Sequence, residues 1–153
     1  MRRTWIGLVL LCALAAGPAV AQSLDTPQNA DAAWMKAMKA NDLDAVVACY
    51  APDAVLWLPE APEARGSEAI RKTYAGYFDA YRVADAALTN VTHQTSGDVD
   101  GNWGYFLLDL RPKKGGDPVV LKGRFATVMK RIGGRWLLVM DHASATPPPP
   151  AKP

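Results

Sequence analysis

Cysteine and histidine are scarce in this chain. Among 153 residues there are 2 cysteines and 2 histidines, and the histidines, His93 and His142, lie far apart in the sequence. Zinc sites are usually built from several Cys and His ligands, so we expect no metal site. The chain also has no glycine-rich phosphate loop and no serine-nucleophile motif. These absences argue against a metal- or nucleotide-dependent protein, and no cofactor is expected.

The N-terminus has the pattern of a cleavable signal peptide. Two arginines precede an apolar stretch from Trp5 to Ala16, and Ala19-Val20-Ala21 matches the small-x-small cleavage pattern. A transmembrane anchor is the alternative, but a span needs about 20 apolar residues, and Gly17-Pro18 ends this stretch earlier. We therefore expect cleavage after Ala21, a periplasmic or secreted protein, and no stable membrane anchor after cleavage.

Removal of residues 1–21 changes the charge and the thiol content. Arg2 and Arg3 leave, so that 17 basic residues become 15, against 15 acidic ones. A chain without basic excess argues against binding to nucleic acid or to an anionic membrane. Only Cys49 remains, so no internal disulfide can form. We interpret Cys49 as a small buried hydrophobe rather than a nucleophile, because no histidine is near it in sequence.

The spacing of apolar residues predicts an α+β fold. Apolar side chains recur at three- and four-residue steps in the first half, and from Val83 onward the period changes to two. Gly97 to Asn102, Lys113 to Asp117 and Gly133-Gly134 have the composition of turns. We expect helices over about 27–40, 43–50 and 66–81, a short strand over 54–58, and long antiparallel strands over about 83–96, 102–111, 118–131 and 135–145.

Several segments in this order resemble the nuclear transport factor 2-like superfamily, in particular its SnoaL-like branch. They are "NDLDAVVACYAPDAVLWLP", the helix start "RGSEAIRKTY" and the terminal hairpin "GRFATVMKRIGGRWLLVMDHAS". The resemblance covers roughly residues 26–145. It implies a cone-shaped, curved antiparallel sheet wrapped around three N-terminal helices. We therefore divide the chain into a signal peptide (1–21), a cone domain (22–146) and a Pro-rich tail (147–153) that is expected to be extended.

The resemblance also implies a pocket between the helices and the concave sheet, and often a homodimer through the outer sheet face. Its members include isomerases, polyketide cyclases, dehydratases, a kinase association domain and many domains without a known reaction. Relatives often carry a histidine where this chain has Met140, and a threonine where it has Ala126. Fold alone does not decide function, and both departures weaken any transfer of chemistry.

The terminal hairpin holds the main candidates for chemistry. With a three-residue loop, Arg124 would lie opposite His142 on one sheet face, where they could share an anionic ligand. A two-residue loop would place Arg124 opposite Ala143 instead. In one interpretation Arg124 holds an anionic oxygen while His142 moves a proton. In the other, which we favour, both belong to a buried structural network or to a dimer contact. Asp141 is either a base with a raised pKa or a solvated residue at the strand end.

Further candidates come from other strands and from the third helix. Tyr105 and Asp109 share one face of their strand and are candidates for the same cavity, although Asp109 is more simply a solvated residue near a strand end. Most of the large aromatic residues, Trp103 among them, are expected in the core. Trp57, Tyr74 and Phe78 are expected to line the pocket, because relatives place this strand and helix at its mouth.

Three functions remain open on the sequence. The first is an exported domain that binds a small, partly apolar molecule or mediates assembly, as a homodimer and without catalysis. The second is a cofactor-independent isomerase, cyclase or lyase that uses Asp141 or His142 with Arg124. The third is a module that binds a protein partner. The loss of the second strand histidine at Met140 favours the first.

Overall fold

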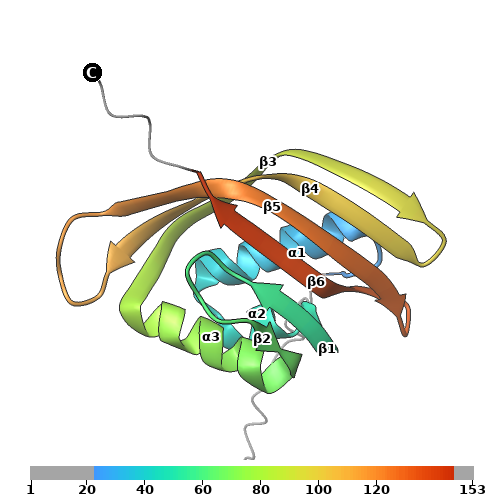
Figure 1. Ribbon diagram of the computed structural model, residues 1–153, viewed down its shortest axis with the longest axis horizontal. Coiled ribbons are helices and arrows are strands. Elements are labelled where there is room, and N and C mark those ends of the chain that lie inside the picture. The colour runs from blue at the N-terminus through green and yellow to red at the C-terminus, as the bar shows by residue number, and fades with distance from the viewer. Residues whose placement is uncertain (1–22, 147–153) are drawn as a thin grey trace, which may run out of the picture.

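The computed structural model describes residues 23–146. The predicted signal peptide and Pro-rich tail lie outside these residues. Three helices precede most of a six-stranded sheet (Figure 1). The elements are α1 (Pro27–Ala40), α2 (Leu43–Val47), β1 (Tyr50–Trp57), β2 (Ala64–Arg65), α3 (Gly66–Ala80), β3 (Tyr81–Ser96), β4 (Val99–Pro112), β5 (Val119–Ile132) and β6 (Arg135–Ala145).

The ends of α1 are set by two polar side chains. At its N-terminus, Oγ1 of Thr26 accepts a hydrogen bond from the backbone N–H of Asn29 at 3.1 Å, which satisfies one of the free amides of the first turn. At its C-terminus, Asn41 has φ 55° and ψ 37°, a left-handed conformation that asparagine tolerates well. The Asn41 amide then bonds the backbone N and O of Val83 at 2.8 and 3.0 Å, which ties α1 to β3.

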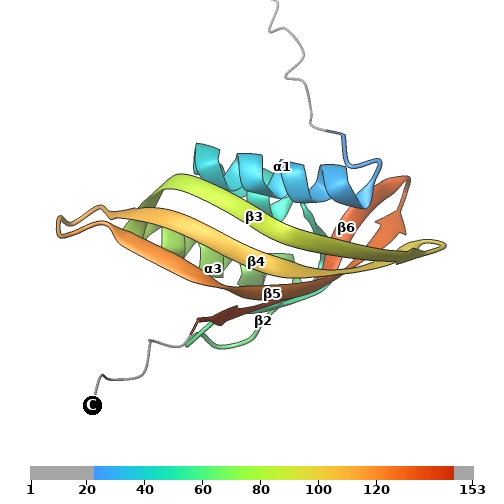
Figure 2. The same ribbon diagram turned by 90° about the horizontal axis from the view of Figure 1, so that it is seen from above.

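The sheet is mixed and strongly curved. Its strand order is β2-β1-β6-β5-β4-β3, with β1 parallel to β6 and all other neighbours antiparallel. The helices pack against one face of this sheet (Figures 1 and 2). The predicted α+β class and the curved sheet around three helices are confirmed, with one correction: the first strand joins the sheet in parallel.

The second helix is shorter than predicted, and the first strand is longer. The helix ends at Val47, and β1 begins at Tyr50 instead of Ala54. The reason is tertiary: the backbone N–H of Leu138 bonds the carbonyl of Cys49 at 2.9 Å, and Tyr50 pairs with Leu138 in β6. The register shifts between Tyr50 and Val55. This irregularity contains Pro52, which cannot donate to the ladder.

Burial alternates along the long strands and defines their two faces. In β4 the even-numbered residues from Asp100 to Leu110 are buried toward the helices, and in β5 the odd-numbered residues from Gly123 to Met129 are buried. Their neighbours of opposite parity point to the outer face of the sheet. This alternation decides which candidate side chains can reach the interior.

The β5–β6 hairpin has a two-residue loop and a bulge. Gly133 and Gly134 have φ angles of 57° and 80°, as a tight hairpin turn with two positive φ angles requires. The register then shifts by one residue between Val128 and Met129. Beyond this bulge Arg124 pairs with Ser144, and His142 pairs with Ala126. Both predicted pairings of Arg124, with His142 and with Ala143, are therefore wrong.

Candidate binding and acid–base site

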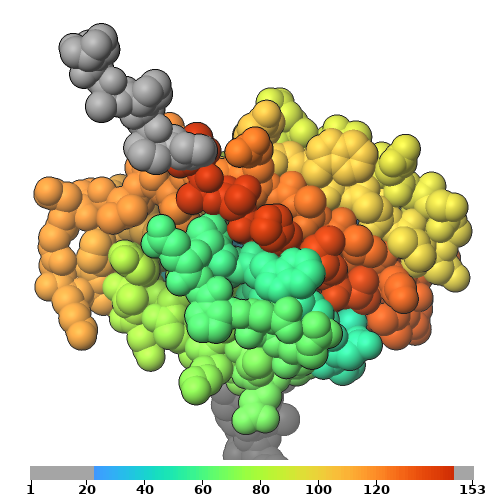
Figure 3. All heavy atoms as spheres, viewed as in Figure 1, coloured from blue at the N-terminus to red at the C-terminus, as the bar shows by residue number. Residues whose placement is uncertain are grey.

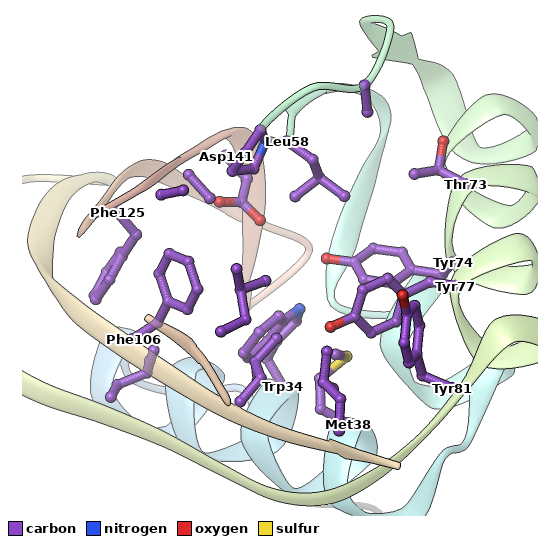
Figure 4. Close-up of a pocket in the computed structure, with 18 of the residues that line it drawn as sticks. Trp34, Met38, Leu58, Thr73, Tyr74, Tyr77, Tyr81, Phe106, Phe125 and Asp141 are labelled. Atoms are coloured by element: carbon purple, nitrogen blue, oxygen red, sulfur yellow. The ribbon is translucent and has the colours of Figure 1, made fainter. Parts of the chain in front are cut away.

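A cavity of about 540 Å³ lies between the helices and the concave face of the sheet. This volume is typical of sites for small molecules. The walls are mainly apolar and aromatic (Figure 4). Three carboxyl groups interrupt them. The lining includes Asp31, Trp34 and Met38 from α1, Leu58 to Ala61 after β1, Thr73, Tyr74 and Tyr77 from α3, Tyr81 and Leu88 from β3, Phe106, Leu108 and Leu110 from β4, Val119, Leu121, Phe125 and Thr127 from β5, and Leu138, Asp141, Ala143 and Ala145 from β6.

The segment from Leu58 to Ala61 covers one side of the cavity. It follows β1 and lies beside α3 and the end of β6 on the face seen in Figure 3. Its Glu60 is exposed and has φ 56°. An acidic side chain therefore stands where the cavity meets solvent.

Asp141 is a carboxyl group inside this cavity. It belongs to β6, is 8 % exposed and points toward the aromatic side chains of α1 and α3 (Figure 4). Burial raises the pKa of Asp141 to about 6, while the hydrogen bond from Tyr50 and the charge of His142 lower it. A carboxyl group with a pKa near neutrality can both accept and return a proton at physiological pH.

Two tyrosines support Asp141 from behind. The Tyr50 hydroxyl donates to Oδ2 of Asp141 at 2.6 Å, and the Tyr50 and Tyr74 hydroxyl oxygens are 2.7 Å apart. Since Tyr50 has one proton and gives it to the carboxylate, Tyr74 must donate to Tyr50. Burial raises the pKa of both tyrosines well above its usual value. They therefore remain protonated donors and hold Oδ2 in place.

A second polar group meets the cavity from α1. Oδ1 of Asp31 accepts a hydrogen bond from the side-chain amide of Asn102 at 3.0 Å, and Oδ2 lies 3.2 Å from Nε2 of His93. Nδ1 of His93 lies 2.9 Å from Asp100, and the Thr95 hydroxyl also donates to Asp100. Burial raises the pKa of Asp31 to about 6, against the lowering effect of His93.

Strand register aligns these groups in one row. His93 pairs with Asn102, Asn102 with Thr127, and Thr127 with Asp141. The Thr127 hydroxyl is hydrogen-bonded to the Asn102 side chain. A polar row thus crosses β3, β4, β5 and β6 on the concave face, and Asp31 lies against it from α1.

Of the residues expected at the site, two line the cavity: Asp141 and Tyr74. Phe78 is buried in the core beside Tyr74 rather than in the cavity wall. The other candidates are on the outer face, because strand parity turns them away from the helices. These are Trp57, which is 40 % exposed, Tyr105, which is 51 % exposed, Asp109, which is paired with Arg111 at 2.9 Å, and the exposed Arg124 and His142.

Arg124 and His142 were predicted to lie on one face of the sheet, and both do face the same side. That side is the outer one, where Arg124 and Tyr105 border a shallow depression with Trp103. Trp57, the neighbour of His142 across the strands, stacks edge-on against it with ring centroids 6.1 Å apart. Neither Arg124 nor His142 can assist Asp141 inside the cavity.

A family model described as the SnoaL-like domain matches residues 32–139. The chain belongs to the SnoaL-like domain family. The fold is that of the nuclear transport factor 2-like superfamily, as the resemblance predicted. Two of the three cavity carboxyls, Asp31 and Asp141, lie just outside the matched residues.

Solved structures with this SnoaL-like fold share little sequence with the chain. A ketosteroid isomerase-like protein from Erwinia carotovora is 24% identical, with a TM-score of 0.71 over 82% of this chain and 97% of that one. A proposed dehydratase from Streptomyces avermitilis is 18% identical, with a TM-score of 0.66 over 79% and 94%. A proposed kinase II association domain from Xanthomonas campestris is 22% identical, with a TM-score of 0.67 over 74% and 81%. No curated protein matches the chain.

Two kinds of feature are absent from the part of the chain that the structure describes. Residues 23–146 contain no cluster of three or more His, Cys, Asp or Glu side chains arranged to hold a metal ion. No helix among them is long and apolar enough to cross a membrane.

Cys49 is a buried free thiol whose pKa is raised by burial to about 11.

Proposed function

We propose that this SnoaL-like domain binds a small, partly apolar molecule in its cavity and transfers a proton to and from it through Asp141. The observation that carries the proposal is the placement of Asp141: a buried carboxyl, held by Tyr50 on one oxygen, on the wall of an aromatic cavity. The chemistry is that of a cofactor-independent isomerase or lyase. Among similar structures, a ketosteroid isomerase-like protein and a proposed dehydratase are named for reactions of this kind.

The reaction needs one proton-accepting group and a conjugated substrate. The ionised Asp141 carboxylate takes a proton from a carbon next to an electron-withdrawing group, and the C–H electron pair moves into the conjugated system. The protonated carboxyl then returns the proton to another carbon, which gives isomerisation, or to a leaving group, which gives elimination. Asp31, at the same cavity, is the second carboxyl able to exchange a proton.

Proton abstraction is testable without knowing the substrate. We expect the full chain in D₂O to catalyse deuterium incorporation at the α-carbon of ketones. The panel contains ketones with aromatic, aliphatic and ammonium-bearing bodies, and NMR measures the incorporation. Asp141→Asn should lower the rate by about 10²- to 10⁴-fold, the usual contribution of a general base. Asp53→Asn, which removes an exposed acid outside the cavity, should have no effect. Equal rates for the native chain and Asp141→Asn would contradict the proposal.

Binding without catalysis is the second candidate. It is favoured by one observation: no Lys, Arg or His of residues 23–146 lines the cavity, so no cation there can stabilise a developing oxyanion. In that case ligands would bind and depend on the cavity side chains, but the native chain would exchange no more deuterium than Asp141→Asn.

A further inference from the structure

The charged side chains that line the cavity are all acidic, and one of them, Asp31, is paired with His93 from outside the lining. Three acids, Asp31, Glu60 and Asp141, line it, and within the described residues no basic side chain does. Arg124 and His142, the basic residues expected there, are on the outer face of the sheet. The field inside the cavity therefore repels anions and attracts cations.

Asp141 is a buried acid without a cationic partner. Its hydrogen-bond partner is the neutral hydroxyl of Tyr50, and no ion pair to Asp141 is found among residues 23–146. A buried carboxylate is costly unless it is paired with an opposite charge or takes up a proton. A positively charged ligand would supply the missing partner.

The remaining cavity wall suits the same ligand. The rings of Trp34, Tyr74, Tyr77, Tyr81, Phe106 and Phe125 surround the space into which Asp141 points (Figure 4). Tryptophan and tyrosine faces attract organic cations, and aromatic walls combined with carboxylates are a general means of binding ammonium groups. An inorganic cation would not use these rings.

We propose that the cavity selects an organic cation, an amine or quaternary ammonium with an apolar body, whose charged group lies between Asp141 and the aromatic rings. The inference rests on the proposed function only in placing a small molecule in this cavity; it does not require catalysis. It replaces the anionic ligand that the sequence suggested through Arg124.

Matched ligands of similar shape and different charge test whether the charge of the ligand determines its affinity. Isothermal titration calorimetry and thermal shift would compare phenethyltrimethylammonium with its neutral carbon analogue, (3,3-dimethylbutyl)benzene, and with 3-phenylpropanoate. The cation should bind at least about tenfold more tightly than the neutral analogue, as cation–π and charge pairing predict, and 3-phenylpropanoate should bind most weakly. Asp141→Asn should remove most of the preference for the cation, and Asp53→Asn should keep it.

The possible results distinguish this inference from the proposed function. Equal binding of the cation and its neutral analogue, tighter binding of 3-phenylpropanoate, or a cation preference that survives in Asp141→Asn would overturn the inference. Unchanged binding of the neutral analogue to Asp141→Asn shows that this variant is folded. Failure of all three ligands to bind the native chain would count against the proposed function as well.

Discussion

At the scale of single residues, the site depends on one buried acid and the groups that keep it in place. Asp141 is held by Tyr50, which is in turn bonded to Tyr74. The two tyrosines come from β1 and α3, so three distant parts of the chain meet at one carboxyl group. Burial opposes its ionisation, and the Tyr50 hydroxyl partly compensates.

The raised pKa of Asp141 predicts a pH-dependent stability. Its folded pKa of about 6 exceeds the value of about 4 in an unfolded chain. The folded state therefore binds this proton more tightly, and the stabilisation is fully present below pH 4 and lost as the pH rises through 6. The expected loss is about 3 kcal/mol.

Asp141→Asn should not show this loss. Urea unfolding between pH 4 and 8 should find that the stability of the variant relative to the native chain increases with pH. The comparison removes most of the contribution of Asp31, whose pKa is also raised, chiefly by burial and only in the smallest part by Asp141. A stability difference that is the same at every pH would contradict the prediction.

At the scale of elements, the packing of β5 against its neighbours depends on a position where no side chain fits. A Cβ at Gly123 would overlap the backbone oxygen of Ser144 and lie 2.6 Å from the ring of Phe106. Phe106 lines the cavity from the neighbouring strand. The glycine thus lets β6 and the Phe106 ring approach β5 closely.

Gly123→Ala should destabilise the protein by roughly 2 kcal/mol or more, because overpacking forces backbone shifts. Gly101→Ala is the matched control, since a Cβ there meets no atom within 4 Å. Thermal unfolding of both variants measures the difference. Similar melting temperatures would show that β5 and β6 can separate without cost.

The elements themselves were largely predictable, but the site was not. Periodicity located the helices and the four long strands, since each buries one face. The bulge between Val128 and Met129 has no sequence signal, and it decides the partners of Arg124 and His142. Asp31, His93 and Asn102 were missed because their meeting depends on packing between α1 and the β3–β4 hairpin. Asn102 belongs to the even-numbered, buried face of β4, which is continuous with the face of β6 that carries Asp141. This alternation was the signal that could have identified Asn102.

At the scale of the whole molecule, the two faces of the sheet have different properties. The concave face holds the cavity. The outer face exposes Trp103 and Tyr105, at 45 % and 51 % of their surface, although Trp103 was expected in the core. Large exposed aromatics on one sheet face are typical of protein contacts. We propose that the outer face forms a homodimer, as the resemblance implied.

Trp103→Arg should convert this dimer to a monomer. The new arginine would lie beside Arg124 on the outer face, and these positive charges would repel the same charges of the second copy across the interface. Sedimentation equilibrium of residues 22–153 would measure the mass. Trp57→Arg, which alters an exposed tryptophan on β1, in the other half of the strand order from Trp103 on β4, is the control and should leave the mass unchanged. A native chain that is monomeric at high micromolar concentration would refute the proposal.

Carbon NMR can show whether Asp141 is an acid–base group whose pKa lies near neutrality. The Cγ resonance of Asp141 in ¹³C-aspartate-labelled protein, assigned by its loss in Asp141→Asn, would be followed from pH 3 to pH 9. The structure predicts a midpoint at about pH 6, and a higher midpoint in Tyr50→Phe, where the lowering hydrogen bond is gone. A midpoint near 4, as for an ordinary solvated carboxylate, would contradict the account.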